Sequence, residues 1–349
     1  MYYNIKTVGK NMDDKKLKVG VIGVGALGRF HTKFYTESSN AELIGIYDAN
    51  SESAQRISKE FNVKAFSTIE ELAEVCEGLS IAVPATLHHA IAMPLLKAKK
   101  HLLVEKPLAA SVEQAGELVR MAEDNDLVLE VGHTERYNPI MGFINDKIED
   151  VRCIEARRMA PYPPSRPGMH PRGTEVGVVL DLMIHDLELI LHIVNSKVRK
   201  VEAAGISVLS ETEDVASARI TFKNGCVANV KSSRIHDKAL RRMLLYQSNS
   251  YLSLDYGERS GFVCSKGENG GIIKEEIPIK DHNALAVEIE NFVENALIAV
   301  KTGSVPELKV PGRRGLEALR LAIKITEEIH KHNRKYNLND GKTEEFNQF

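Results

Sequence analysis

Apolar and polar positions follow two alternating patterns along the first third of the chain. Short apolar runs, typical of buried strands, are separated by stretches in which apolar residues recur every three or four positions, typical of helices. The predicted strands are Leu17–Ile22, Ala41–Tyr47, Leu79–Val83, His101–Val104 and Leu127–Val131. Strands that alternate with helices in this way predict an α/β fold with a doubly wound parallel sheet.

The pattern changes after Pro139, where strict alternation of apolar and polar residues becomes dominant. A short helix is followed by a strand, a Pro-rich stretch, a helix, a series of strands and two further helices. After the short helix, the expected positions are Val151–Met159 for the strand, Pro161–Pro171 for the Pro-rich stretch and Leu180–Val194 for the helix. The series of strands is expected at Val198–Pro278 and the last two helices at Ala284–Val300 and Leu316–His330. Asn224-Gly225 between two alternating runs predicts a hairpin. We therefore expect a C-terminal α+β domain with a large, open, mainly antiparallel sheet.

These patterns divide the 349 residues into an extension (1–16), a cofactor domain (17–135), a second domain (136–335) and a tail (336–349). The polar stretch from Lys331 onward is expected to fray, and the last helix can pack back on the first domain. A sheet covered by helices on one face leaves its other face for solvent or for a second subunit. We expect a homodimer or homotetramer.

Two helix starts carry a capping-box pattern, in which a Ser is followed three residues later by Glu or Gln. These are Ser67 with Glu70 and Ser111 with Gln114. Each pattern predicts that a helix begins directly after the serine.

Composition excludes several classes of function. The net charge is −2 with both signs mixed along the chain, so neither nucleic acid nor an anionic membrane is an expected partner. No apolar run has the length of a signal peptide core or a membrane span, which predicts a cytoplasmic protein. The four cysteines contain no Cys-x-x-Cys pair, so we interpret them as reduced packing residues rather than disulfide or metal ligands.

A glycine motif lies where the first predicted strand meets the first helix. The sequence there is Gly23-Val24-Gly25-Ala26-Leu27-Gly28, and Asp48 closes the next strand twenty residues later. Such glycines permit a tight turn, approach of the backbone to a pyrophosphate, and close packing of helix on strand. Asp48 can accept hydrogen bonds from a ribose, and no Arg or Lys follows nearby to bind a 2′-phosphate. The motif therefore predicts a dinucleotide site that favours NAD over NADP.

Two further features carry candidate chemistry. Lys106 stands between a strand and Pro107, which restricts its backbone and can direct its ammonium toward a cofactor, although an ordinary exposed lysine fits as well. The helix Leu180–Val194 carries a polar stripe of Asp181, His185, Glu188 and His192. Asp181 can orient His185 as a general base. A solvated helix face and a metal site are the alternatives, and we expect no metal because one helix rarely supplies a full ligand set.

In combination, the glycine motif with Asp48, the segment from Pro84 to His88, Glu105-Lys106-Pro107 and Asp181-x-x-x-His185 resemble the Gfo/Idh/MocA oxidoreductases. The resemblance runs from Lys18 to about His330 and implies a Rossmann domain that binds NAD(P) and oxidises or reduces a secondary hydroxyl. It places Lys106 on the reacting hydroxyl, His185 as general acid/base and Asp181 as its assistant. It implies cofactor contacts from Pro84, His88, Glu105 and Lys106, with a cis peptide before Pro107. Val83 departs from the Thr or Ser of many members.

Within that family, the segments Gly132–Pro139 and Asp181–Asp186 resemble the branch that oxidises the 3-hydroxyl of UDP-N-acetylglucosamine or a related UDP-sugar. A diphosphate requires cations, and Arg157, Arg158, Arg166 and Arg172 flank or lie within the Pro-rich stretch. Arg172 is the first candidate for a substrate contact, with Arg166 and Tyr137. Two alternatives remain: a dehydrogenase of inositol or a free sugar, and a non-enzymatic NAD-sensing regulator.

Overall fold

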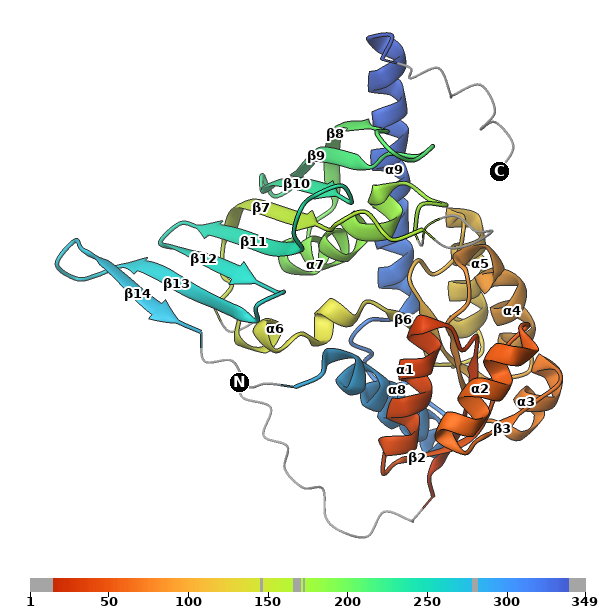
Figure 1. Cartoon of the computed structure of the whole chain (residues 1–349). Helices are drawn as coiled ribbons and strands as arrows, with labels where there is room; N and C mark the ends of the chain where they lie inside the picture. The colour runs from red at the N-terminus through yellow and green to blue at the C-terminus, as the bar shows by residue number, and fades with distance from the viewer. Residues whose placement is uncertain (1–14, 145–146, 166–170, 172, 278–281, 339–349) are drawn as a thin grey trace. The chain divides into compact units, whose positions relative to one another are not determined.

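The structure, a computed structural model, describes residues 15–144, 147–165, 171, 173–277 and 282–338. The chain divides into two compact units, and Figure 1 labels most of their helices and strands. The first unit comprises Met1–Tyr137 and His282–Leu316, and the second comprises Asn138–Asp281 and Glu317–Phe349.

The first unit contains a parallel sheet in the order β3-β2-β1-β4-β5-β6. Its strands are β1 (Leu17–Ile22), β2 (Ala41–Tyr47), β3 (Lys64–Ala65), β4 (Gly78–Ile81), β5 (His101–Glu105) and β6 (Leu129–Gly132). Its helices are α1 (Ala26–Glu37), α2 (Ser51–Phe61), α3 (Ile69–Val75), α4 (Ala85–Lys97), α5 (Val112–Glu123) and α8 (Ala284–Thr302). The predicted doubly wound sheet is confirmed. Its strand order reverses between β1 and β4, where such sheets bind their ligands.

Side chains of β1 alternate between two covered faces. Val19 and Val21 belong to a core that includes Phe292 of α8, whereas Gly20 points to the other face. A Cβ at Gly20 would lie 2.9 Å from Leu72 Cδ1 of α3. Helices therefore cover both faces of β1, which explains why this strand reads as one continuous apolar run.

Helix α8 packs in the first unit, against α1 and β1, although the sequence analysis assigned its residues to the second domain. Its apolar spacing correctly predicted a buried face, but spacing cannot specify which core buries it. Helix α9 (Gly312–Lys335) begins beside β6, because a Cβ at Gly315 would stand 2.5 Å from Val131 Cγ2.

A buried carboxyl group joins β6 to α8. Glu130 is fully buried and accepts a hydrogen bond from Asn295 Nδ2 at 2.5 Å. Tyr137 donates its hydroxyl to Asn291 Oδ1 at 2.9 Å and lies 3.4 Å from Glu130 Oε2. Burial raises the pKa of Glu130 to about 7, against the opposing effects of these hydrogen bonds and of the Lys309 charge. The carboxyl group is therefore protonated in the folded protein under mildly acidic conditions.

This raised pKa predicts a pH-dependent effect of Glu130→Gln on stability. The folded state holds a proton that the unfolded state releases above about pH 4.5. The free energy of unfolding of the wild type therefore falls by about 3 kcal/mol between pH 4.5 and 7. Gln keeps an acceptor for Asn295 and cannot ionise. We expect the variant's Tm to exceed that of the wild type by about 5 °C or more at pH 8, and by little at pH 5. An equal difference at both pH values in thermal unfolding would contradict the assignment.

Local capping signals were accurate in one of two cases. Ser111 Oγ accepts the amide of Gln114 at the start of α5, as predicted. The other helix begins one residue later than expected, because Thr68 rather than Ser67 caps α3 and accepts the amide of Glu71. Both Ser67-x-x-Glu70 and Thr68-x-x-Glu71 fit a capping box, so spacing alone did not discriminate between them.

The second unit contains an eight-stranded sheet in the order β14-β13-β12-β11-β7-β10-β9-β8. Its strands are β7 (Val151–Met159), β8 (Val198–Ile206), β9 (Val215–Phe222), β10 (Val227–Ser233), β11 (Leu240–Gln247), β12 (Ser250–Asp255), β13 (Ser260–Lys266) and β14 (Ile272–Glu276). All neighbours are antiparallel except β7 and β10. The predicted mainly antiparallel sheet is confirmed, and β9 and β10 form the hairpin expected around Asn224-Gly225, with Gly225 at φ 89°.

Helices pack on one face of this sheet to form the core of the second unit. They are α6 (Pro139–Ile144), α7 (Ile184–Val194) and the part of α9 from Ala318 to Ile329. Helix α9 continues to Lys335, so the expectation that the chain frays from Lys331 was wrong. Lys331 pairs with Glu328 at 2.8 Å, and such pairs one turn apart support an exposed helix.

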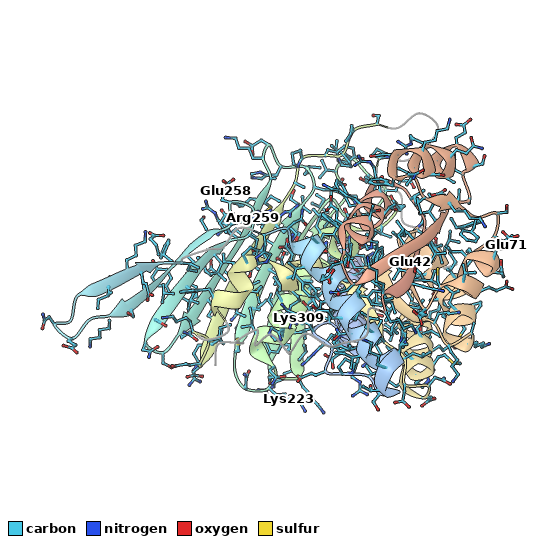
Figure 2. The ribbon with its side chains drawn as sticks, turned by 90° about the horizontal axis from the view of Figure 1, so that it is seen from below. Glu42, Glu71, Lys223, Glu258, Arg259 and Lys309 are labelled. Atoms are coloured by element: carbon cyan, nitrogen blue, oxygen red, sulfur yellow. The ribbon has the colours of Figure 1, made fainter. Side chains whose placement is uncertain are left out.

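Charged groups of both signs are spread over the surface. Figure 2 shows Glu42 and Glu71 on the first unit and Lys223 and Glu258 on the second, and all four are exposed. This agrees with the mixed charge of the sequence. Among the described residues, no helix is both long enough and apolar enough to span a membrane.

Candidate active site

Two of the three glycines of the β1–α1 turn, Gly23 and Gly28, are required by geometry. Gly23 has φ 83°, and a Cβ there would lie 2.7 Å from the carbonyl oxygen of Ala82. A Cβ at Gly28 would lie 1.8 Å from Gly23 O, so only glycine lets the helix pack this closely. Within the described part of the chain, nothing beyond its chain neighbours comes within 4 Å of a Cβ built on Gly25. The turn thus leaves open the side from which a pyrophosphate would approach the amides of α1.

Asp48 lies against this turn. Its Oδ2 accepts the amide of Val24 at 2.7 Å, and its Oδ1 accepts the amide of Asn50 at 2.8 Å. The side chain is half-buried at the carboxyl end of β2. Each carboxylate oxygen retains capacity for a second hydrogen bond, which is what recognition of a ribose diol requires. These residues, with Ala26 and Leu27 in the first turn of α1, fit a dinucleotide.

The segment after β4 contains two of the predicted cofactor residues. Pro84 is exposed and precedes α4. His88 is buried, and its ring lies between two backbone carbonyls, 2.9 Å from Val83 O and 2.8 Å from Pro107 O. Burial lowers the pKa of His88. Its ring therefore braces the turn that carries Lys106, and the Val83 side chain is not used in this contact.

Lys106 follows β5 and is half-buried, and its peptide bond to Pro107 is cis, as expected. The Glu105 carboxylate points inward, with Oε1 3.1 Å from His31 Nε2 and Oε2 accepting the Lys106 amide at 3.2 Å. Burial opposes ionisation of Glu105, but the hydrogen bond and charge of His31 and the charge of Lys106 hold its pKa below the usual value. Burial and the charge of Lys106 lower the pKa of neighbouring His133 to about 3. The strand end therefore presents a cation backed by a carboxylate.

In the second unit, Asp181 and His185 stand at an irregular start of the predicted helix. Val179–Met183 forms a π-helical turn before α7, and such wide turns are common at functional sites. Asp181 and His185 are both half-buried. A Cβ at Gly173, which has φ 84°, would lie 2.6 Å from Asp181 Oδ2, so the loop before the helix passes directly over this carboxylate.

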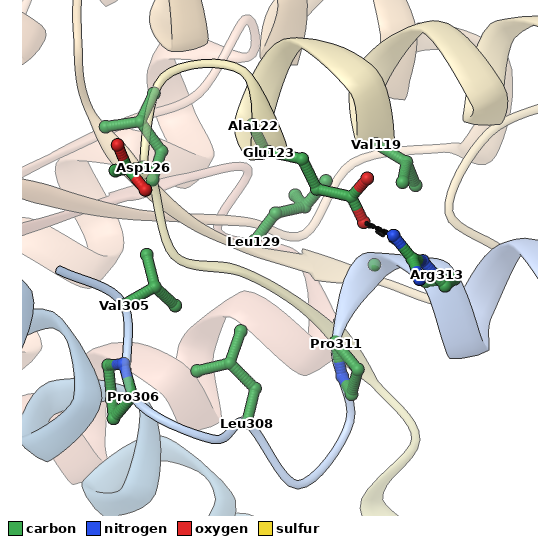
Figure 3. Close-up of a pocket in the computed structure, with 12 residues that line it drawn as sticks. Val119, Ala122, Glu123, Asp126, Leu129, Val305, Pro306, Leu308, Pro311 and Arg313 are labelled. Carbon is green, nitrogen blue, oxygen red and sulfur yellow. Dashed lines mark hydrogen bonds and ion pairs between the residues drawn. The ribbon is translucent and has the colours of Figure 1, made fainter.

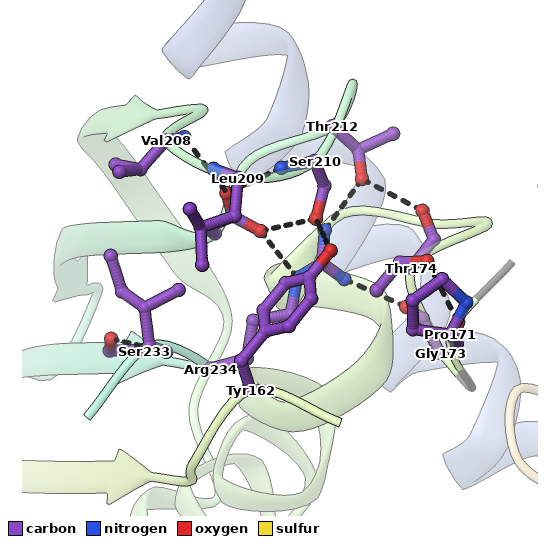
Figure 4. A network of polar contacts seen from close by, with 12 residues as sticks. Tyr162, Pro171, Gly173, Thr174, Val208, Leu209, Ser210, Thr212, Ser233 and Arg234 are labelled. Carbon is purple, nitrogen blue, oxygen red and sulfur yellow. Dashed lines mark hydrogen bonds and ion pairs between the residues drawn. The ribbon is translucent and has the colours of Figure 1, made fainter. Parts of the chain in front are cut away.

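A buried arginine that no sequence pattern indicated holds that loop. Arg234 donates to the carbonyls of Gly173 and Val176, each at 2.7 Å, to Thr212 Oγ1 at 2.7 Å and to Asp214 Oδ1 at 2.8 Å (Figure 4). The Asp214 carboxylate also accepts the amides of residues 208–210. Burial would raise the pKa of Asp214, but these hydrogen bonds and those of Ser210 and Arg234 lower it. The network fixes the backbone that leads to Asp181.

Another predicted cation is also used internally. Arg158 of β7 pairs with Asp186 of α7 through Nε–Oδ2 at 2.9 Å and Nη2–Oδ1 at 3.0 Å, and both side chains are almost fully buried. This pair holds the residue next to His185, so Arg158 is not placed as a phosphate contact. Glu188, expected in the polar stripe, is buried as well. Arg166 and Arg172 lie outside the described residues.

Tyr137 contacts other residues of the first unit through its ring, its hydroxyl and its carbonyl. Its side chain is 2% exposed, the Lys309 ammonium lies 4.5 Å from its ring centroid, and its carbonyl is 2.9 Å from His282 Nε2. Burial and the nearby carboxylates raise the pKa of its hydroxyl. Tyr137 therefore helps to hold α8 in the first unit, and we leave it out of the proposed substrate site.

A cavity of about 310 Å³ in the first unit lies away from these residues (Figure 3). It is lined by the end of α5, the start of β6 and the segment before α9, and the ion pair of Glu123 with Arg313 stands at its rim. It adjoins the amino end of β6, whereas the glycine turn lies at the carboxyl end of a parallel strand. The cavity is therefore separate from the candidate dinucleotide site. No group of three or more metal-ligating side chains is found in the described ranges.

Comparison with known proteins agrees with this architecture. Residues 17–133 match the family model described as "Oxidoreductase family, NAD-binding Rossmann fold", and residues 145–252 match the "GFO/IDH/MocA C-terminal domain". The chain is 34% identical over 289 residues to the UDP-N-acetylglucosamine 3-dehydrogenase of Acidithiobacillus ferrooxidans, covering 81% of this chain and 89% of that protein. A solved structure of the same enzyme superposes with a TM-score of 0.82 at 31% identity, covering 91% and 99% of the two chains.

A myo-inositol 2-dehydrogenase of Thermotoga maritima is 24% identical over 323 residues, which cover 87% of this chain and 94% of that protein. The two family models match adjacent parts of the chain, and the alignment with the Acidithiobacillus relative covers 81% of the chain. The chain belongs to the Gfo/Idh/MocA family of oxidoreductases, with a nicotinamide cofactor as the group that its glycine turn fits.

Proposed function

We propose that this protein oxidises the 3-hydroxyl of UDP-N-acetylglucosamine, or of a closely related UDP-sugar, with NAD. The observation that carries the proposal is the 34% identity to a UDP-N-acetylglucosamine 3-dehydrogenase over 289 residues. The second candidate is oxidation of inositol or a free sugar, favoured by the longer but weaker similarity to a myo-inositol 2-dehydrogenase.

A panel of substrates tests this choice. Purified protein with NAD is offered UDP-N-acetylglucosamine, UDP-glucose, myo-inositol and glucose, and NADH absorbance is followed. The proposal expects reduction with the UDP-sugars and competition by UDP. Reduction with inositol or glucose alone would transfer the function to the second candidate, and no reduction with any alcohol would contradict both.

Three side chains are proposed to carry the reaction. His185 takes the proton of the reacting hydroxyl, and Asp181 orients its imidazole. The Lys106 ammonium donates to the same oxygen and stabilises the negative charge that develops there. A nicotinamide held at the glycine turn would supply the acceptor for the hydride of the carbon that carries this hydroxyl, so that the alcohol would become a ketone. The protein contributes positioning and charge.

The contacts of Asp48 support NAD rather than NADP, and Asp48→Asn tests this. The variant keeps one acceptor oxygen for the Val24 amide but loses the charge that binds a ribose diol and repels a 2′-phosphate. We expect Kd for NAD to rise about 10-fold or more, since a hydrogen bond to a charged group contributes about 1.5–3 kcal/mol. Kd for NADP should stay equal or fall, as measured by titration calorimetry. An unchanged ratio of the two constants would contradict the role of Asp48.

Arg172 and Arg166 remain candidates for contacts with the substrate diphosphate on the grounds of sequence alone. Guanidinium groups bind phosphate oxygens in a bidentate manner. The engagement of Arg158 with Asp186 leaves Arg157, Arg166 and Arg172 of the four arginines that flank or lie within the Pro-rich stretch.

We also propose a homo-oligomer formed through the open face of the eight-stranded sheet. Cross-strand neighbours Cys153, Tyr246, Tyr251 and Cys264 form a row on the face opposite to the core. Tyr246 and Tyr251 stack at 5.9 Å, and Phe262 meets Tyr251 edge-on at 5.9 Å. Aromatic residues are enriched at the centre of protein interfaces.

Substituting Tyr246→Glu would introduce a charge into this row. We expect light scattering to show a dimer or tetramer for the wild type and a monomer for the variant, because an unpaired charge is costly at a closed interface. Val75→Glu, at an exposed position at the end of α3, is the matched control and should keep the wild-type mass. A monomeric wild type would contradict the proposal.

A further inference from the structure

Four buried polar side chains form a continuous chain inside the first unit. Tyr35 OH lies 2.6 Å from Ser80 Oγ, which lies 3.1 Å from His31 Nδ1. His31 Nε2 lies 3.1 Å from Glu105 Oε1, and Glu105 Oε2 accepts the Lys106 amide at 3.2 Å. The chain therefore runs from the last turn of α1 to β4, back to His31 in the middle of α1, and on to the end of β5, which Lys106 follows.

The burial of these groups requires an explanation. Tyr35, Ser80 and His31 are at most 1% exposed, and Glu105 is 6% exposed. Strands of a parallel sheet covered on both faces are ordinarily apolar, and a buried carboxylate is costly unless it is paired. A hydrophobic core at this position would need none of the four. The two members of this chain nearest to Lys106, His31 and Glu105, therefore point to a role in the site.

The neighbouring strand leaves room for the carboxylate. A Cβ at Gly132, at the end of β6, would lie 2.9 Å from Glu105 Oε2 and 3.2 Å from Glu105 Cα. Any other residue at this position would push Glu105 away from the Lys106 amide. The orientation of the carboxylate is thus determined from two sides, by His31 on α1 and by the missing side chain on β6.

We propose that His31 and Glu105 act as a positioning couple for Lys106, in which His31 fixes the Glu105 carboxylate and the carboxylate fixes the backbone and the charge environment of the lysine. This inference rests on the proposed role of Lys106 in the reaction. His88, His133 and Arg136 also interact electrostatically with this region. His31 also stands three residues after Gly28, so the couple links the helix of the dinucleotide turn to the strand that carries Lys106.

The test uses Glu105→Gln and His31→Gln, which preserve approximate size and hydrogen bonding. For each we expect kcat to fall about 10- to 100-fold, the range in which misplacement of a catalytic group acts, while Kd for NAD changes less than about threefold. Tyr35→Phe is the matched control. It breaks the far end of the same buried chain, so it should lower the thermal midpoint and leave kcat within about twofold of the wild type.

A double-variant cycle separates this couple from a purely structural role. If Glu105 acts through Lys106, Glu105→Gln should lower kcat when it is introduced into the wild type. The same substitution should cause no further loss of kcat when it is introduced into the Lys106→Met variant. Independent, multiplicative losses would overturn the inference, as would normal kcat in both single variants of the couple. If either variant fails to fold, the other still supplies the cycle. Retained turnover in Lys106→Met alone would instead overturn the proposed function, which keeps the two failures distinguishable.

Discussion

Replacing Lys106 with Met should reduce kcat by about 100- to 1,000-fold, the loss seen when one donor to a developing oxyanion is removed. Met has similar length and no charge, so the fold of the β5 end should persist. Because the glycine turn and Asp48 form the proposed dinucleotide site, Kd for NAD should change less than about fivefold. Steady-state kinetics with the preferred sugar and a separate NAD titration measure the two effects.

Lys97→Met is the control for this substitution. Lys97 is exposed at the end of α4 in the same unit, and its replacement should leave kcat unchanged. Turnover at the wild-type rate in Lys106→Met would remove the lysine from the mechanism. A rise in Kd for NAD equal to the loss in kcat would make it a cofactor-binding group only.

Replacing His185 with Ala should lower kcat/KM by about 100- to 10,000-fold and change its pH dependence. A general base must be neutral to accept the hydroxyl proton, so the wild-type rate should rise with pH until the imidazole has lost its proton. The variant should lack this rise, because the group that titrates is absent. The measurement is a pH profile of kcat/KM for both proteins.

His332→Ala serves as the control, since His332 packs at 4.8 Å on Tyr336 near the end of α9. Its profile should coincide with that of the wild type. A His185→Ala variant that is slow but keeps the same rise with pH would show that another group is the base. Asp181→Asn should retain the rise and lose less activity, because it alters the surroundings of the ring but leaves the titrating imidazole in place.

Features determined by adjacent residues could be predicted from the sequence. The glycine turn, the position of Asp48 after β2, the hairpin at Asn224-Gly225 and the Ser111 cap each depend on a few consecutive residues with defined backbone requirements. Short or equivocal signals failed. The two residues of β3 are too few for a pattern, and Ser67 and Thr68 offered the same cap one residue apart.

Features that depend on distant partners could not be predicted. Arg158 looked like a phosphate ligand because no pattern links it to Asp186, 28 residues away on another element. Arg234 and Asp214 are 20 residues apart, and they meet only when β9 and β10 pair. The apolar spacing of α8 indicated a buried face without naming the core that receives it. No sequence signature predicted the π-helical turn beside His185.

The most direct test of the account follows the hydrogen on C3 of the sugar. UDP-N-acetylglucosamine that carries deuterium at C3 is incubated with the protein and NAD, and the reduced dinucleotide is analysed by mass spectrometry. The account predicts that NADH carries one deuterium. The sugar nucleotide should become a 3-ketone, three mass units lighter than the labelled substrate and two lighter than unlabelled UDP-N-acetylglucosamine. Reduced dinucleotide without deuterium, or no reduction at all, would contradict it.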